Sequence, residues 1–444
     1  MSGYYADLKA KLDLQDYKSA AEFVDSSKKK YGKKNILLFY LDSGLINHFA
    51  DNYSKSSKSF DSAKKQFEFY YTKSISAYGA SMVFNDSALP YYSRDYEIAH
   101  TCVFEALNYI LSSNADEAVV EARRADTMFK MFSANQNGKN FYKDDGFIRY
   151  FMGFVYENAG YLNDAHLSYY LALKAYKDGL AEIEPPQDLI NDAYTTAVLL
   201  NFDERISEIK KSYPSAKKTL IPRGYGECII LDYNGYIPEK IEKTFDFALY
   251  DIWPYINEVS VDDQDKRDFD KARSIGVAAF ADDYIKVAFP QYKDAANAVN
   301  SFSVSASGGN KKSYPVQDFS AIAKKCLKND TGKIYAKTLA RAAVKYVVGK
   351  SVSAAVQRST GDAWGALTQA AFNVYSAVSA NADTRDWKTL PDKILMSRFF
   401  LPAGQNSLTV NFIGASGEIL ASKEVGVFIK EGKKNFVVLR SVLN

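Results

Sequence analysis

The stretch Gly153-Phe154-Val155-Tyr156-Glu157-Asn158-Ala159-Gly160, followed by Ala165, Tyr169 and Ala172, decides the expected fold. Its small residues stand where two antiparallel helices can cross closely, and its aromatic residues can fill the space beside that crossing. Gly160 falls where the chain must turn between the helices, a place that favours glycine. We therefore expect two antiparallel helices joined by a short turn.

Weaker versions of the same pattern recur through residues 1–205. We align four degenerate units, of which the stretch at 153–172 is the fourth and clearest. The residues that mark the other three are Leu8, Tyr17, Ala20 and Phe23, then Gly44, Tyr53, Phe60 and Ala63, then Ala106, Tyr109, Ala118, Ala122 and Ala125. A polar insertion is expected at 132–145, and a helix around 186–209 would cap the stack. Such units are typical of a tetratricopeptide-like solenoid, here over residues 1–210.

From Pro214 onward, strand patterns appear. The continuous apolar run Cys228–Leu231 predicts a buried strand, because strands covered on both faces lose the alternation of polar and apolar residues. Further strands are expected at 284–289, 298–306, 394–401, 408–412, 419–429 and 436–442, and helices at 317–327, 333–357 and 363–379. The stretch 334–355 is also basic on one side, which fits a helix facing the core or one lying on a membrane surface.

The predicted fold class is therefore α+β: an N-terminal helical solenoid followed by a mixed α/β region that ends in an antiparallel sheet or small sandwich. We expect the solenoid at 1–210, a mixed α/β domain at 215–380, and a C-terminal antiparallel β segment at 381–444 packed on that domain.

The charge of the chain is balanced, with 56 basic and 53 acidic residues among 444. Nucleic-acid binding requires a clustered basic surface, so no nucleic-acid partner is predicted, and the runs Lys28–Lys30 and Lys33–Lys34 are expected to solvate a helix end. No stretch approaches the roughly 20 apolar residues that span a bilayer. The widely spaced Cys102, Cys228 and Cys326 predict buried thiols rather than a zinc site or a disulfide framework.

Two patterns resemble metal sites but are incomplete. Glu97-x-x-His100 has the spacing of one half of a di-iron site, and the chain contains no second pair of this kind. The acidic cluster Asp262–Asp270 lacks the glycine and glutamate that a calcium-binding EF-hand loop needs. The sequence also lacks the glycine-rich phosphate loops and the nucleophile elbow of common enzyme classes. We predict no catalytic residue, no metal and no cofactor.

A second informative stretch is Ala382-Asp383-Thr384-Arg385-Asp386-Trp387-Lys388-Thr389-Leu390-Pro391, followed by Leu-Pro-Ala-Gly at 401–404. Trp387 is expected to anchor this loop on the sheet, and Arg385 to bridge locally to Asp383.

This stretch resembles the closing segment of a family of bacterial tetratricopeptide-containing lipoproteins, with the pattern ADTRxWxxLPxxI…LPAG. Residues 230–240 (Ile-Leu-Asp-Tyr-Asn-Gly-x-x-Pro-x-Lys) and 287–292 (Val-Ala-Phe-Pro-x-Tyr) are similar to signatures of its middle region. The resemblance implies a periplasm-facing envelope location and a lipid-anchored N-terminus in the precursor, whose cysteine would lie upstream of Met1. It also implies association with other envelope lipoproteins, of the curli-secretion-pore-like and peptidoglycan-synthase-activator kinds, and no catalytic residue.

The predicted function is a non-enzymatic scaffold or assembly factor of the bacterial cell envelope, which binds another envelope protein or lipoprotein in a helical-repeat groove. The predicted partner-binding residues are Tyr109, Tyr150, Tyr156, Asp383, Arg385 and Trp387. For the last three, we favour a structural clasp over a partner-binding role. The alternatives are an envelope polymer-processing enzyme, with the solenoid as substrate arm and acidic residues as acid and base, and a cytoplasmic adaptor.

Overall fold

The computed structural model describes residues 2–77, 89–134, 141–248, 284–306, 309–332 and 382–443, together with positions 334, 335, 338, 339, 342 and 346. The acidic cluster at 262–270 and the helix expected at 363–379 lie outside the described residues. Of the helix expected at 333–357, only the isolated positions just given are described, and these are helical.

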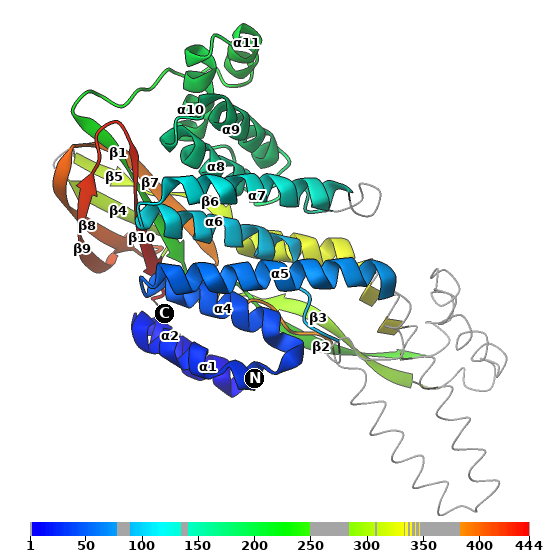
Figure 1. Ribbon diagram of the computed structural model, residues 1–444. Coiled ribbons are helices and arrows are strands. Elements are labelled where there is room, and N and C mark those ends of the chain that lie inside the picture. The colour runs from blue at the N-terminus through cyan, green and yellow to red at the C-terminus, as the bar shows by residue number, and fades with distance from the viewer. Residues whose placement is uncertain are drawn as a thin grey trace, which may run out of the picture.

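The N-terminal half is a stack of helical hairpins, seen from the blue end to the green end of Figure 1. The helices are α1 (Ser2–Asp13), α2 (Tyr17–Ser26), α3 (Lys28–Tyr31), the 3₁₀ turn η1 (Lys33–Asn35), α4 (Ile36–Phe49), α5 (Tyr53–Ala77), α6 (Asp95–Leu111), α7 (Ala115–Ala134), α8 (Gly146–Asn158), α9 (Leu162–Lys177), α10 (Gln187–Leu199) and α11 (Asp203–Ser212). The hairpins pair α1 with α2, α4 with α5, α6 with α7, α8 with α9, and α10 with α11. The expected cap around 186–209 is thus itself a hairpin.

The same turn closes each of these hairpins. One residue has a left-handed φ, between 55° and 84°, at Gln15, Asp51, Ser113, Gly160 and Asn201. The next backbone N–H returns to the carbonyl five residues earlier, as Asn52 does to Asn47 and Tyr161 to Tyr156, both at 2.9 Å. This hydrogen-bonding pattern is the Schellman motif at a helix C-terminus, whose left-handed position favours glycine. In four of the five hairpins that position nevertheless holds a residue larger than glycine. A repeated turn gives each hairpin the same hand, and so lets neighbouring hairpins stack.

Close packing inside the hairpins depends on glycine, as the sequence pattern predicts. A Cβ on Gly153 of α8 would overlap the ring of Tyr169 of α9, and one on Gly44 of α4 would overlap the ring of Phe60 of α5. Both rings are fully buried. In each hairpin, the aromatic ring of one helix occupies the space that a side chain at the glycine of the other helix would need, and this sets how closely the two helices approach.

The strands form two four-stranded sheets and a separate hairpin. They are β1 (Tyr225–Asn234), β2 (Glu239–Ala248), β3 (Tyr284–Lys293), β4 (Ser301–Ala306), β5 (Gly309–Lys312), β6 (Tyr314–Asp318), β7 (Lys393–Pro402), β8 (Gly404–Ile413), β9 (Ile419–Ile429) and β10 (Lys434–Ser441). The inner sheet has the order β10-β1-β7-β6, with β10 parallel to β1 and the other pairs antiparallel. The outer sheet has the antiparallel order β5-β4-β8-β9, and β2 pairs with β3.

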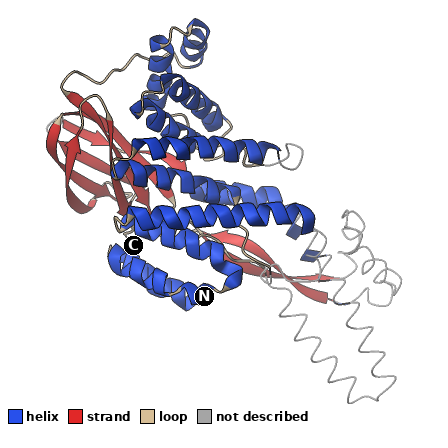
Figure 2. Cartoon of the chain, in the orientation of Figure 1, coloured by secondary structure: helices blue, strands red, loops and turns tan. Residues whose placement is uncertain are grey.

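The two sheets and the helices make three layers, and Figure 2 shows the strands of the two four-stranded sheets gathered along one side of the helical stack, with the β2–β3 hairpin apart from them. Strand β1 is covered on both faces. Its Ile229 and Leu231 pack into the core shared with the helices, whereas Cys228 and Ile230 pack into the core between the sheets. Burial on both faces explains the continuous apolar run in the sequence. The predicted small sandwich is confirmed.

Most predicted strands are confirmed, with ends displaced by up to a few residues. The helix expected at 317–327 occupies 319–332, and the strands β2, β5 and β6 were not predicted. Strands from 225–318 and from 393–441 share both four-stranded sheets, so the boundary expected at 381 does not separate two sets of strands. None of the described helices combines the length and the apolar character required to cross a membrane.

Candidate functional site

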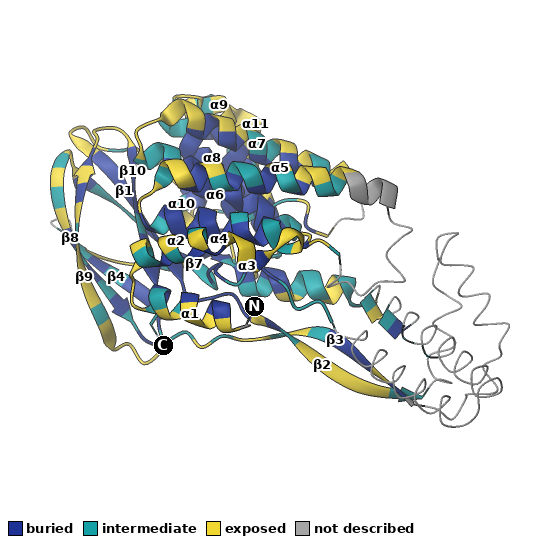
Figure 3. Ribbon diagram, turned by 60° about the horizontal axis from the view of Figure 1, so that its bottom comes forward, coloured by how far each residue is buried: buried dark blue, intermediate teal, exposed yellow. Residues whose placement is uncertain are grey.

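The first helix of each later hairpin faces the strands. We call the surface formed by α4, α6, α8 and α10 the inner face. In helical-repeat proteins such a surface is the usual place for a partner. Here it is occupied by the chain itself, as the burial colours of Figure 3 show where the helices meet the strands. The polar contacts that join it to the inner sheet and to residues 382–392 include those of Asp42 with Thr389, Glu97 with Trp387, His100 with Gln317, Asn158 with Lys434, and Asp188 with Tyr314.

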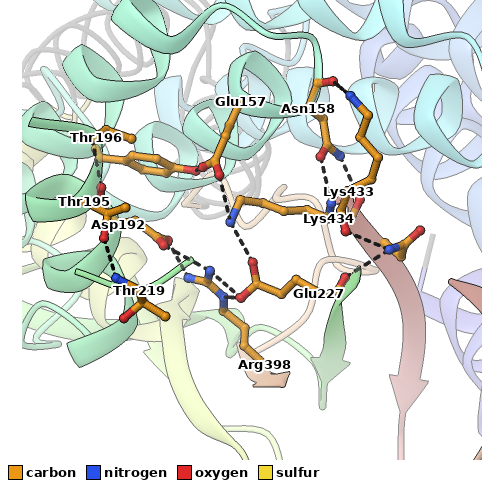
Figure 4. Close-up of polar contacts among 12 residues, drawn as sticks. Glu157, Asn158, Asp192, Thr195, Thr196, Thr219, Glu227, Arg398, Lys433 and Lys434 are labelled. Carbon is orange, nitrogen blue, oxygen red and sulfur yellow. Dashed lines mark hydrogen bonds and ion pairs between the residues drawn. The ribbon is translucent and has the colours of Figure 1, made fainter. Parts of the chain in front are cut away.

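A buried group of charges forms the largest of these contacts (Figure 4). We call it the Arg398 cluster, and its members are Tyr150, Glu157, Asp192, Glu227, Arg398 and Lys434. The Arg398 guanidinium, on β7, lies 2.5 Å from Asp192 on α10 and 2.6 Å from Glu227 on β1, and it also donates to the Tyr150 hydroxyl on α8. The Lys434 ammonium, on β10, lies 2.6 Å from Glu227 and 3.5 Å from Glu157. The cluster therefore ties two hairpins to three strands.

Burial and charge oppose each other in this cluster. The side chains of Arg398 and Lys434 are each only 4% exposed. Burial favours the neutral form of Glu227, yet Arg398 and Lys434 outweigh it and hold the pKa of Glu227 below its usual range. For Asp192 burial prevails, so that its pKa is raised despite the same two cations. Because every charge here has a partner inside the protein, the arrangement serves attachment rather than chemistry on a substrate.

Residues 382–391, which we call the clasp segment, attach the strands to the first hairpins. The Arg385 guanidinium lies 2.7 Å from Asp383, as predicted, and donates to the Leu89 carbonyl at 2.9 Å. The Trp387 side chain is fully buried, with its ring 6.3 Å from Phe60 and 6.1 Å from Phe104. Trp387 thus docks between α5 and α6 and not on the sheet, which corrects the predicted anchoring. These contacts fit the structural role of the clasp segment.

The three tyrosines predicted to line a groove have different surroundings. Tyr150 is fully buried and bonded to Arg398, and Tyr156 is 3% exposed. Neither ring is accessible to a partner, so the prediction for these two is wrong. Tyr109, near the end of α6, is half-buried and packs at the margin of the core.

Three of the carboxyl groups with raised pKa values lie in the interior as well. Burial is the main cause at Asp42, Glu105 and Asp386, whose exposed fractions are 0%, 0% and 3%. The Glu97 carboxylate beside Asp386 adds to its shift. A polymer substrate needs acid and base groups that it can touch, and these three are enclosed.

The incomplete metal patterns also have structural roles. With the proton on Nδ1, the His100 imidazole donates to the Tyr96 carbonyl at 2.8 Å. Its Nε2 then accepts from the side-chain amide of Gln317, also at 2.8 Å. Glu97 accepts from Trp387 N–H and Tyr91 hydroxyl instead. Across the described part of the chain, no three His, Cys, Asp or Glu side chains gather in the way that a metal ion requires.

Exposed aromatic side chains occur at two of the hairpin turns. The residue after the left-handed position stands at the N-cap position of the next helix. In the first three hairpins this residue is polar: Asp16, Asn52 and Asn114. In the last two hairpins it is Tyr161 and Phe202, which are 46% and 39% exposed. We call Tyr161, Phe202 and the exposed Leu199, which ends α10 in the same turn as Phe202, the turn edge.

The backbone at these aromatic positions would accept a capping residue. Asp16 has φ −85° and ψ 69°, and its carboxylate accepts from the Ser19 N–H at 3.1 Å. Tyr161 has φ −85° and ψ 70°, and Phe202 has φ −88° and ψ 76°, without a side-chain cap. Omitting a cap costs about 1 kcal/mol per helix. The aligned turns were the sequence signal for these residues, since aromatic side chains stand where the first hairpin has the capping Asp16 and the next two have asparagine.

No protein-family model matches the chain, and no curated protein matches it. Several solved structures are similar in part, YrrB and RapI among them. YrrB, a TPR protein with an unusual peptide-binding site, matches with a TM-score of 0.28 and 14% identity over 48% of this chain and 85% of its own. The apo form of RapI matches with a TM-score of 0.35 and 9% identity over 84% of this chain and 74% of its own. Both TM-scores are below 0.5, so neither match assigns a function to this chain.

Proposed function

We propose that this protein is a non-enzymatic scaffold or assembly factor of the bacterial cell envelope that binds another envelope protein through the turn edge. The observation that carries the proposal is the pair of uncapped, exposed aromatic residues, Tyr161 and Phe202. Two adjacent hairpins each forgo a stabilising cap at a position where the backbone would accept one. Stability given up at exposed positions is typical of residues kept for binding.

The turn edge has the chemistry of a protein contact. Tyr161 and Phe202 are rigid rings on fixed turns, so ordering them against a partner loses little conformational entropy. The guanidinium of Arg123 lies 5.8 Å from the Tyr161 ring, and the His166 ring lies 5.4 Å from that of Phe202, which holds both rings in place. Aromatic anchors flanked by arginine are typical of the residues that dominate binding energy.

The inner face is not proposed as the binding surface. A partner there would have to displace the inner sheet and leave Arg398, Glu227 and Asp192 without their partners. Breaking one buried pair costs about 3–5 kcal/mol, before the apolar contacts of the same interface are counted.

The envelope location is the less direct half of the proposal. It is supported by the resemblance of residues 382–404 to the closing segment of bacterial tetratricopeptide-containing lipoproteins. On that basis we propose a periplasm-facing protein, lipid-anchored in its precursor, with another envelope protein or lipoprotein as partner.

Photo-crosslinking in cells tests this function. A benzophenone amino acid would replace Tyr161 or Phe202 in the full-length protein, and mass spectrometry would identify what is captured. Phe428 on β9 is a matched control, since it is aromatic and 63% exposed but lies on the outer sheet. We expect one envelope protein to be captured from both turn positions and not from 428. Equal capture from all three positions, or none from 161 and 202, would refute the proposal.

A pair of capping variants separates binding from folding. Tyr161→Asn and Phe202→Asn introduce the residue found at the equivalent places in two other hairpins, Asn52 and Asn114. The gained cap offsets the lost contact of a half-buried ring, so stability should stay within about 1 kcal/mol of wild type. Capture of the partner should nevertheless be lost. Retention of the partner by both variants would place its binding site elsewhere.

A further inference from the structure

The lysine runs singled out in the sequence form an exposed basic surface. Lys28, Lys29 and Lys30 lie on α3, and Lys33 and Lys34 on η1, and all five are exposed. Between Asp25 and Asp42 the chain has no acidic residue. No ion pair joins any of these five lysines to a carboxylate within the described residues. We call these five residues the lysine patch; the ammonium groups of Lys28 and Lys30 lie over aromatic rings of the protein, and all five side chains remain exposed to solvent.

The lysine patch is held in a fixed position. Tyr31, between the two runs, is 2% exposed, and its hydroxyl donates to Asp42 at 2.7 Å and accepts from the Tyr4 hydroxyl at 3.0 Å. Gly32 turns the chain from α3 into η1 with a φ of 68°. Lys28 to Lys34 are seven consecutive residues that form two single helical turns on either side of Gly32, so the five charges lie within about 25 Å of chain. Figure 3 shows α3 beside the start of α1, where Tyr4 lies.

The chemistry of the patch favours a surface of anionic lipid headgroups. All five residues are lysines, which act as point charges, and arginine, the usual choice for bidentate phosphate recognition, is absent. No large apolar side chain is exposed between Leu14 and Phe69, all of which is described, so nucleic-acid bases have no ring on which to stack. A small convex group of lysines suits the diffuse potential of an anionic bilayer, to which each lysine near the surface contributes independently.

We propose that the lysine patch docks this protein on a membrane surface containing anionic lipid. The patch would lie against the headgroups without insertion, leaving the turn edge free for its partner. This inference rests on the patch alone and does not require that the proposed protein partner exist.

Vesicle binding tests the proposal. The full chain would be sedimented with large unilamellar vesicles of phosphatidylcholine containing about one third phosphatidylglycerol, and with vesicles of phosphatidylcholine alone. We expect binding to the anionic vesicles only, and its loss when NaCl rises from 0.05 M to 0.5 M, because salt screens the interaction. Each neutralised lysine should weaken binding roughly fivefold, so K29Q/K33Q/K34Q should weaken it on the order of 100-fold.

The triple variant keeps Lys28 and Lys30, whose ammonium groups lie 5.0 Å and 5.8 Å from the rings of Tyr40 and Tyr4, so that local packing is preserved. The control variant K217Q/K311Q/K312Q removes the same charge from exposed lysines elsewhere. Equal weakening by both variants would mean that net charge alone attracts the protein, and would overturn the proposal. So would binding to a DNA duplex through the same three lysines without binding to vesicles.

Discussion

Replacing Arg398 with methionine should reveal how firmly the helices are attached to the inner sheet. Methionine has a similar length and no charge, so the change removes the guanidinium and leaves an apolar stem. Asp192 then loses the cation 2.5 Å away, while Glu227 keeps Lys434 at 2.6 Å. An unpaired carboxylate in the interior costs about 3–5 kcal/mol. That is a large part of the 5–15 kcal/mol by which folded proteins are usually stable.

The second variant, R398M/D192N, removes the stranded charge together with its partner. Its free energy of unfolding should recover to within about 2 kcal/mol of wild type, because a buried pair replaced on both sides is often nearly neutral. Urea unfolding followed by fluorescence measures both variants, and an unchanged m-value would show that the same surface is exposed on unfolding. The exposed pair Lys324–Asp294 is the control, and K324M should cost less than about 1 kcal/mol.

The pH dependence gives an independent check on R398M. Without the guanidinium, the pKa of Asp192 rises further, and the folded chain takes up a proton that the unfolded chain releases above its ordinary aspartate pKa. The loss of stability should therefore be smaller at pH 5 than at pH 8. If R398M and R398M/D192N are destabilised equally, or if neither responds to pH, the Arg398 cluster does not act as described.

Three further changes follow from the packing and the buried charges. Gly153→Ala should lower the free energy of unfolding in urea by about 1–3 kcal/mol, because the added methyl group overlaps the Tyr169 ring. Gly160→Ala adds a methyl group that meets no atom, and should cost only about 1 kcal/mol because of the positive φ at that position. Similar costs for the two variants would contradict the close helix crossing at Gly153. Burial raises the pKa of Asp232 to about 6, so the stability that its bound proton contributes is lost as pH rises from 4 to 6. Asp232→Asn lacks this loss, and its free energy of unfolding relative to wild type should increase by about 3 kcal/mol from pH 4 to pH 7; a constant difference would place the carboxyl in contact with water. Trp387→Ala should cost about 3–5 kcal/mol in thermal unfolding because the ring fills the space between α5 and α6, and a cost below 1 kcal/mol would mean that the clasp segment is loosely attached.

Local patterns in the sequence predicted the elements well. The missing side chain at Gly153 and the ring of Tyr169 mark one helix crossing, and the apolar run at 228–231 marks a strand covered on both faces. Strand β2 escaped prediction because its sequence, Glu-Lys-Ile-Glu-Lys-Thr-Phe-Asp-Phe-Ala, carries charges at most early positions and belongs to a two-stranded hairpin. Most of its charged residues are exposed, although Lys240 is buried, so the usual alternation is weak.

The occupied inner face could not be predicted in the same way. The pattern around Tyr150 and Tyr156 marks a helix face that is covered, but it is the same whether the cover is a partner or another part of the chain. The contacts that decide the question join residues far apart, such as Arg398 with Asp192, which are 206 positions apart. Single-sequence periodicity carries no information about such pairs. The turn edge was detectable, since it appears when the five turns are aligned at their left-handed residues.

The central claim is that the inner face is closed by the protein's own strands while the turn edge remains open. Hydroxyl-radical footprinting of the unmodified full-length protein, read residue by residue with mass spectrometry, tests it most directly. The account predicts that Tyr161 and Phe202 are oxidised readily, and that Tyr150, Tyr156 and Trp387 are protected until the protein is unfolded. Oxidation of Tyr150 at a rate comparable to Tyr161 in the folded protein would show an open groove, and would contradict the account.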